Sequence, residues 1–166
     1  DRTGAVYTRT YDMLIERLSA PVVLLQLPIG TESEFAGIVD LIDMKAYVWD
    51  LEANKGDEFR TEEIPANMLD EAKAKRAEMI EKLADVDDSI MELFMEEKEP
   101  STEQIIAAIR KGTVNFTVVP VIMGSAFKNK GVQQMLDAVT RYLPSPLDIG
   151  SIKGFKQGDS SVEIER

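Results

Sequence analysis

The chain has 166 residues, of which 44% are hydrophobic, and a formal net charge of −11. This length fits one ordinary domain or two small lobes with a real core, while the negative charge argues against a protein that mainly binds DNA or other nucleic-acid phosphates. Cysteine and histidine are absent, so disulfides, thiolate metal sites and histidine-based catalysis are excluded, and no apolar run approaches the ~20 residues of a membrane span.

The first third of the sequence predicts one helix followed by strands. Tyr7, Tyr11 and Leu14 recur at helical spacing, which predicts an amphipathic helix over residues 4–19. Apolar runs and alternating apolar and polar residues then indicate strands. These strands are expected at 21–29, at 35–41, at 44–50 and, after a polar loop at 51–57, up to about Thr61.

The pattern becomes helical from residue 66, with a break near Asp87 between two helices. Ser101 and Gln104 form a capping-box pattern, because the hydroxyl and the amide can satisfy the free N–H groups at a helix start. We expect a short helix there, closed by Lys111 and Gly112.

The last third predicts one more strand and one more helix. Residues 116–123 are apolar apart from Thr117, and Pro120 marks an edge strand or irregular pairing because it has no N–H to donate. Apolar residues from Val132 to Leu143 then predict an amphipathic helix, which Pro144 stops.

This order of elements predicts an α/β fold interrupted by an inserted α+β subdomain. Residues 1–30 and 114–149 are interpreted as two pieces of one strand–helix layer, and residues 31–113 as the insert. Residues 150–166 are rich in Gly, Ser and charge, and we interpret them as a linker or the start of a next domain.

Two loops are candidates for ligand binding. The segment GSAFKNKGV at 124–132 lies between the last predicted strand and helix, where open α/β sheets bind their ligands. The segment DRTGA at 1–5 opens the first helix. A Ser-Ala pair after a strand is weak evidence by itself, since a plain turn has the same sequence features.

Longer segments of the sequence help to interpret these two loops. The informative ones are DRTGA, LQLPIG, VDLIDMKAYVW, EEIPANMLDEA, GSAFKNKGVQ and LDAVTRYLPSPLDI. Together they resemble the elongation factor G family of translational GTPases over residues 1–149. The resemblance implies that the chain is the later part of a P-loop GTPase domain, and that residues 31–113 are the subdomain inserted in that family.

The resemblance also implies a guanine site. Asp1 would accept hydrogen bonds from the guanine ring N–H and amine, since a carboxylate is an acceptor-only group that matches two adjacent donors. Ser125 and Ala126 would supply a backbone N–H to the guanine oxygen, with Phe127 as a neighbour that packs. Lys128 and Lys130 could contact phosphates, but a solvated loop face is the favoured interpretation for both.

The family binds GTP or GDP with magnesium and couples GTP hydrolysis to tRNA–mRNA translocation on the ribosome. This chain has no GxxxxGK[ST] phosphate loop and no family catalytic histidine. We therefore expect no catalytic residue, no metal site and no bound nucleotide in the chain alone, and GTPase activity only in a longer parent protein.

Charge is concentrated in the predicted insert, where residues 57–99 hold 15 acidic and 6 basic residues. Acidic side chains recur at helical spacing there: Glu71, Glu78, Glu81, Asp85, Asp88 and Glu92. A solvated helix face explains such a pattern in most proteins. The resemblance implies instead that Glu81, Asp85 and Asp88 contact a basic helix in the C-terminal domain of the ribosomal stalk protein.

Several interpretations stay open at this stage. The chain begins with Asp1 rather than Met, so we expect a cut or processed product of a bacterial cytoplasmic factor that meets ribosomal RNA only through other domains. An organellar homologue or a ribosome-protection paralogue is the alternative within the family. A non-enzymatic acidic adapter that binds a basic ribosomal protein is the alternative outside it.

Overall fold

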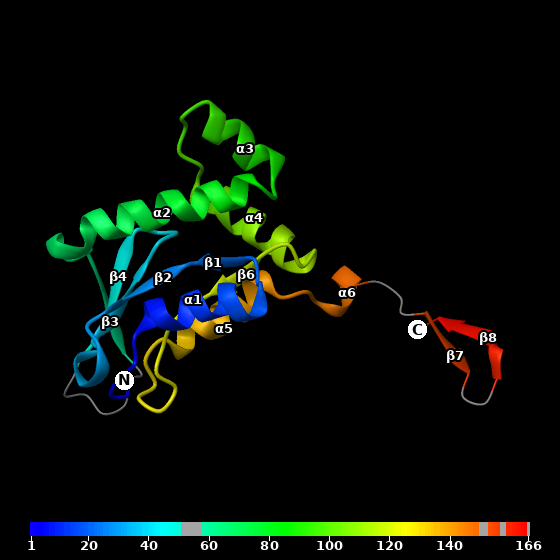
Figure 1. Ribbon diagram of the computed structural model, residues 1–166, viewed down its shortest axis with the longest axis horizontal. Helices are drawn as coiled ribbons and strands as arrows, with labels where there is room; N and C mark the ends of the chain where they lie inside the picture. The colour runs from blue at the N-terminus through cyan, green and yellow to red at the C-terminus, as the bar shows by residue number, and fades with distance from the viewer. Residues whose placement is uncertain (51–57, 150–152, 157–158, 166) are drawn as a thin grey trace.

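The computed structural model describes residues 1–50, 58–149, 153–156 and 159–165. The predicted polar loop at 51–57 lies outside these residues. Strands form a central layer with helices on both sides, and a two-stranded hairpin near the C-terminus lies away from the rest (Figure 1).

The strands belong to three sheets. Their bounds are β1 Val22–Leu24, β2 Gln26–Ile29, β3 Gly37–Asp40, β4 Lys45–Trp49, β5 Phe59–Glu62, β6 Val119–Val121, β7 Lys153–Lys156 and β8 Asp159–Glu165. β1 pairs in parallel with β6, and β2 to β5 form an antiparallel sheet in chain order. The Leu25 N–H donates to the Val121 carbonyl, and the Leu25 carbonyl accepts from the Leu41 N–H. The predicted strand at 21–29 therefore links the parallel pair to the antiparallel sheet.

The helices match most of the predicted periodicity. Their bounds are α1 Tyr7–Leu18, α2 Leu69–Ala84, α3 Asp88–Met95, α4 Thr102–Val114, α5 Val132–Tyr142 and α6 Pro146–Ile149, with short 3-10 turns η1 Glu32–Glu34 and η2 Ala66–Met68. The predicted break near Asp87 is confirmed, because its carboxylate caps α3 by accepting from the Ser89 and Ile90 N–H groups. The capping box of Ser101 and Gln104 is also confirmed at the start of α4.

The prediction that Lys111 and Gly112 end α4 is wrong, because the helix continues to Val114. Gly112 is buried, and a Cβ atom there would lie 2.5 Å from Cγ2 of Val118. The glycine is needed for close packing between the helix and the chain that returns to β6, and not for a helix end. The strand predicted at 116–123 is shorter in the structure, because β6 covers only Val119–Val121, and Phe116 is 85% exposed.

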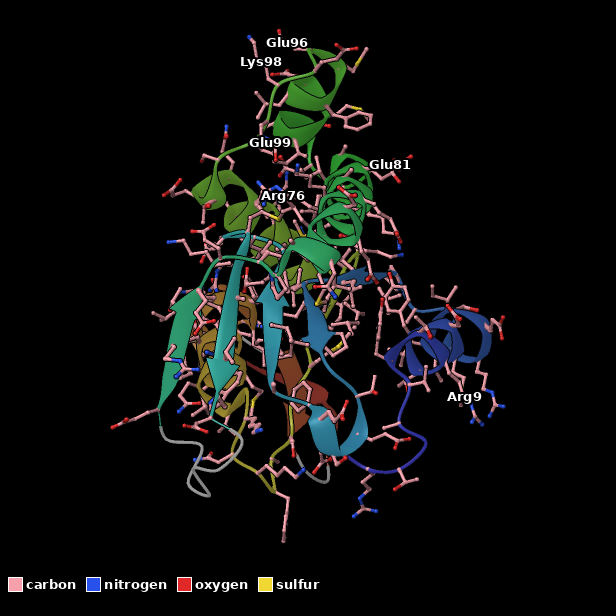
Figure 2. The ribbon with its side chains drawn as sticks, turned by 90° about the vertical axis from the view of Figure 1, so that its left-hand side faces the viewer. Arg9, Arg76, Glu81, Glu96, Lys98 and Glu99 are labelled. Atoms are coloured by element: carbon pink, nitrogen blue, oxygen red, sulfur yellow. The ribbon has the colours of Figure 1, made fainter. Side chains whose placement is uncertain are left out.

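One hydrophobic core joins the two predicted subdomains. Tyr11 of α1 and Leu24 of β1 share a buried cluster with Leu83 of α2 and Ile109 of α4. The helices α2, α3 and α4 lie together on one side of the strands (Figures 1 and 2). A predicted insert thus contributes to the same core as the segments that flank it.

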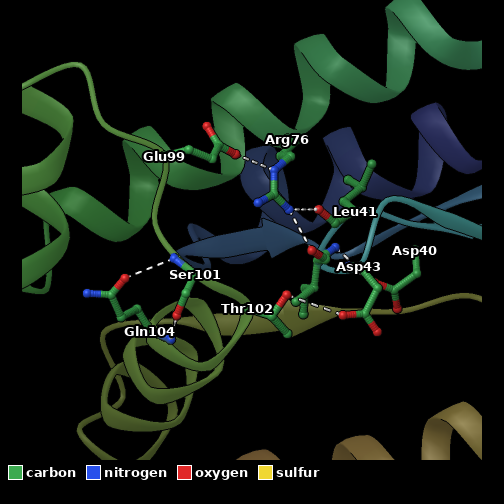
Figure 3. A network of polar contacts seen from close by, with 9 residues as sticks. Asp40, Leu41, Asp43, Arg76, Glu99, Ser101, Thr102 and Gln104 are labelled. Carbon is green, nitrogen blue, oxygen red and sulfur yellow. Dashed lines mark hydrogen bonds and ion pairs between the residues drawn. The ribbon is translucent and has the colours of Figure 1, made fainter.

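A polar network around Arg76 fixes α2 on the sheet (Figure 3). Arg76 Nη1 donates to the carbonyls of Leu41 and Ile42, each at 2.6 Å, in the turn between β3 and β4. In the same turn, Asp40 Oδ1 accepts from the N–H groups of Ile42 and Asp43 at 2.8 and 3.0 Å. Burial raises the pKa of the Asp40 carboxyl, although these two bonds act in the opposite direction.

Two helices expose apolar faces. Ile15 and Leu18 of α1 are 42% and 68% exposed, and Leu136 of α5 is 55% exposed. Within the described residues, β6 pairs with β1 alone. None of the described helices combines the length and apolarity that crossing a bilayer requires.

Candidate functional site

The first candidate loop, Asp1 to Val6, leads into α1. Gly4 has a φ of +78°, which favours glycine, and its N–H donates to Oε1 of Glu32 at 2.7 Å. The Ala5 N–H donates to the Arg2 carbonyl at 3.0 Å, so the loop is a tight turn. Asp1 is exposed at its start.

The second candidate loop, Gly124 to Gly131, connects β6 to α5. The Ser125 N–H donates to the Lys130 carbonyl at 2.8 Å, and the Lys130 N–H donates to the Ser125 carbonyl at 3.0 Å. This two-way bridge closes a small hairpin between the two residues. Gly131 has a φ of +78°, and a Cβ atom there would lie 2.8 Å from the Met123 carbonyl, so the chain can close only with glycine at that point.

The tip of this hairpin points to solvent. Ser125 is 4% exposed, whereas Ala126 is exposed and Phe127 is 99% exposed. The Lys128 N–H donates to Oγ of Ser125 at 3.4 Å. No acceptor lies opposite the N–H groups of Ala126 and Phe127 in the part of the chain that the structure describes. The prediction that Ser125 supplies a backbone N–H to a ligand is therefore wrong, because this N–H is paired with the Lys130 carbonyl. The prediction that the Phe127 ring packs is also wrong, since the ring is 99% exposed, and the free backbone donors of the loop are the N–H groups of Ala126 and Phe127.

The two loops lie at the same end of the molecule (Figure 1). An open cavity of about 500 Å³ lies between them, and its walls are mostly apolar. Asp1 lines it from the first loop, Gly124 from the second loop with Met123 just before it, and Glu32 and Phe35 from the segment between β2 and β3. A smaller space of about 210 Å³ shares Met123 and Gly124 and continues to Ser125 and Ala126. The structure thus brings the predicted guanine residues to one side of the molecule.

The prediction that Lys128 and Lys130 form a solvated loop face is correct for Lys128 and wrong for Lys130. Lys130 is 5% exposed, and its Nζ donates to the Phe35 carbonyl at 2.9 Å. Burial lowers the pKa of the Lys130 ammonium, and the nearby charge of Lys128 lowers it further. Lys130 is therefore used in an internal contact with the chain just before β3.

Of the acidic residues predicted for partner binding, Glu81 lies on α2, away from the two loops (Figure 2). Asp85 directly follows α2, and Asp88 is the first residue of α3. Glu81, Asp85 and Asp88 are all exposed. Glu81 and Asp85 form no side-chain hydrogen bond or ion pair with any described residue. In contrast, Glu78 binds Lys75 and Lys82 at 2.7 and 3.1 Å. The charge of Glu78 is therefore paired, in contrast to the charges of Glu81 and Asp85.

Glu71, another of the predicted acidic residues, also has a partner, because it accepts a hydrogen bond from the Tyr7 hydroxyl at 2.8 Å. Burial raises the pKa of Tyr7 to about 12, and the bond to Glu71 contributes in the same direction. Among the described residues, no group of three carboxylates is arranged to hold a metal ion.

A parallel strand pair followed by a loop and a helix, with a cavity at the carboxyl end of β6, is the arrangement in which open α/β domains bind their ligands. Residues 38–145, well over half of the chain, match the family described as the elongation factor Tu GTP binding domain. The chain belongs to this family, and its fold class, a piece of a P-loop GTPase domain, is as the sequence predicts.

A solved structure supports the same fold. The crystal structure of a protein from Thermus thermophilus is similar to this chain with a TM-score of 0.76 and 24% sequence identity. The match covers 89% of this chain and 22% of that protein. The chain thus spans about a fifth of that protein's length.

Sequence reasoning missed Glu32 and the internal role of Lys130. Glu32 belongs to the polar turn after Gly30, whose composition indicates a loop and gives no partner. Its contact with Gly4 spans 28 residues of sequence, so no local pattern predicts it.

Proposed function

We propose that this chain is the base-recognition part of a translational GTPase of the elongation factor G type. The observation that carries the proposal is the cavity lined by Asp1 on one side and by Gly124 on the other. The uncovered apolar faces of α1 and α5 support it, because the remaining strands of a GTPase sheet would bury them.

The chemistry of the two loops fits guanine. The ring N–H and the exocyclic amine of guanine are adjacent donors, which one carboxylate accepts together. The free N–H groups of Ala126 and Phe127 face solvent and can donate to the guanine oxygen. The exposed Phe127 ring offers an apolar face beside the base.

The phosphates and the hydrolytic step belong to parts of the parent protein outside this sequence. GTP affinity in P-loop GTPases comes largely from the phosphate loop, its lysine and magnesium, and this sequence has no such loop. Two or three contacts to the base do not offset an association cost of ~4–15 kcal/mol. We expect this chain alone to show no GTP binding in calorimetry at micromolar nucleotide; a micromolar dissociation constant would contradict that expectation.

In the parent protein, GTP hydrolysis would drive tRNA–mRNA translocation on the ribosome. An organellar homologue or a ribosome-protection paralogue is the alternative, since both would carry the same loops.

The base-recognition proposal is tested by Asp1→Asn in the full-length parent protein. An asparagine amide can donate where guanine also donates, and it can pair with the second carbonyl of xanthine. We expect affinity for GDP to fall about 100-fold and affinity for xanthosine diphosphate to rise. Unchanged preference between the two nucleotides would overturn the proposal.

The acidic end of α2 supports a second contact, with a basic helix of the ribosomal stalk protein. Glu81, Asp85 and Asp88 are exposed, and Glu81 and Asp85 have no partner among the described residues. Such a surface accelerates the capture of a basic partner more than it tightens the complex. A non-enzymatic acidic adapter would use the same surface.

Charge reversal separates this contact from the effect of net charge. Glu81→Lys with Asp85→Lys should slow association with the stalk protein about tenfold at low salt and weaken its salt dependence. The matched control is Glu58→Lys with Glu63→Lys, which changes net charge equally at exposed positions beside β5. Equal association rates for both double variants would restore the interpretation of a plain solvated face.

A further inference from the structure

Both candidate guanine loops are anchored to one short segment, Gly30 to Phe35, between β2 and β3. Glu32 Oε1 accepts from the Gly4 N–H of the first loop at 2.7 Å. The Phe35 carbonyl accepts from Nζ of Lys130 in the second loop at 2.9 Å. These contacts join residues 28 and 95 positions apart in sequence.

The segment is held in a defined shape. The Phe35 N–H donates to the Glu32 carbonyl at 3.3 Å, and the Ala36 N–H donates to the Ile29 carbonyl at 2.9 Å. Gly30 has a φ of +79°, and a Cβ atom there would overlap the Glu34 carbonyl. Glu32 itself has a φ of +52°, a left-handed conformation that a residue with a Cβ rarely adopts. A strained residue of this kind persists where the surrounding contacts fix it.

The two contacts differ in environment. Lys130 is 5% exposed, so most of its side chain is removed from water, and its ammonium donates to the Phe35 carbonyl and lies within the influence of the Asp50 charge. Glu32 is half-buried and lines the same cavity as Asp1 and Gly124. Its carboxylate accepts from a backbone N–H three residues after Asp1, which is a charge-assisted bond. One turn therefore bonds to both loops.

We propose that Glu32 and Lys130 are positioning residues that fix the spacing between the Asp1 carboxylate and the Ala126–Phe127 donors. This inference rests on the proposed base recognition and names the residues that give it precision. A base that bonds to both loops at once requires a fixed distance between them. Loss of either anchor should therefore weaken recognition of the base more than it weakens binding of the phosphates.

Inosine diphosphate is a suitable probe, because its base lacks the exocyclic amine of guanine and keeps the ring N–H and the oxygen. The full-length parent protein is used, and the ratio of its affinities for GDP and inosine diphosphate is measured. We expect Glu32→Ala to lower this ratio about tenfold, because the carboxylate that reads the amine loses its fixed position. We expect Lys130→Met, which keeps the apolar stem, to lower the affinities for GDP and inosine diphosphate by similar factors of about tenfold, because both bases keep the oxygen that the Ala126 and Phe127 donors read.

Two variants separate positioning from general damage. Glu32→Gln keeps a side-chain oxygen that accepts from Gly4, so it should restore the ratio to within about twofold of the parent. Glu34→Ala removes an exposed carboxylate from the same turn that makes no side-chain contact with described residues, and it should leave the ratio unchanged.

The outcomes are distinguishable from those for the proposed function. If Asp1→Asn changes the base preference, while Glu32→Ala leaves the ratio at the parent value and Lys130→Met leaves the affinity for GDP at the parent value, the positioning role is wrong and base recognition stands. If Glu32→Gln lowers the ratio as much as Glu32→Ala does, the hydrogen bond from Gly4 does not maintain the ratio, and the positioning role is also wrong. If Asp1→Asn has no effect, base recognition fails and this inference fails with it.

Discussion

Replacing Arg76 with methionine should destabilise the chain through two backbone carbonyls. In the native structure Arg76 Nη1 donates to the carbonyls of Leu41 and Ile42, each at 2.6 Å, and the arginine side chain is 13% exposed (Figure 3). Methionine retains most of the stem and so leaves little empty volume. The main effect is that both carbonyls lose their donor in a region with little access to water.

The magnitude follows from the burial of these groups. Leu41 is 0% exposed and Ile42 is 6% exposed, and a buried acceptor left without a partner costs ~1–3 kcal/mol. The bond from Arg76 Nε to Glu99 adds less than ~1 kcal/mol, because the Glu99 side chain is 67% exposed. One nitrogen serves both carbonyls, so the two terms are not fully additive, and we expect a total loss of ~2–4 kcal/mol.

Urea unfolding followed by Trp49 fluorescence measures this loss. Trp49 is the single tryptophan of the chain and is 1% exposed in β4. The midpoint for Arg76→Met should fall by ~1–2 M urea. The control is Arg60→Met, which breaks an ion pair with Glu62 whose side chains are 68% and 48% exposed, and it should change stability by less than ~0.5 kcal/mol. Equal midpoints for the two variants would refute the reasoning.

Three further variants test other contacts by the same unfolding assay. Gly112→Ala should destabilise by ~1–3 kcal/mol despite its better helix propensity, since the new methyl would overlap Val118; a more stable variant would contradict the close packing. For Asp87, burial raises the pKa, but bonds from Ser89 and Lys111 outweigh burial and lower it, so its stabilisation exists above the ordinary aspartate pKa and is lost as pH falls. Asp87→Ala should therefore cost ~1–3 kcal/mol at pH 7 and progressively less in acid, and a pH-independent difference would count against this. Burial raises the pKa of Tyr142 from 10.0 to about 12, so the stability that comes from its neutral hydroxyl should be lost as pH rises between those values. Tyr142→Phe should make the loss of stability in this alkaline range less steep, and an unchanged slope would exclude the effect.

The local elements could be predicted because their causes are local. The period of apolar residues in α1 and α5 and the side-chain oxygens that begin α3 and α4 are properties of neighbouring residues. The same holds for Pro120, which has no N–H for a ladder and lies in a short strand with a single pairing. Gly112 shows the limit of this reasoning, because its helix-ending signal was overridden by packing against Val118.

For the candidate site, the sequence alone determined the residue types: a carboxylate at Asp1, a Ser-Ala pair at 125–126 and acidic residues at Glu81 and Asp85. Only the tertiary structure decided their relations. It placed Asp1 and Gly124 on one cavity and committed Lys130 to the Phe35 carbonyl. It also made Glu32 the partner of Gly4. The physical reason is that a backbone pattern repeats over a few residues, whereas the burial of a charge and the pairing of a distant N–H depend on how the whole chain closes around its core.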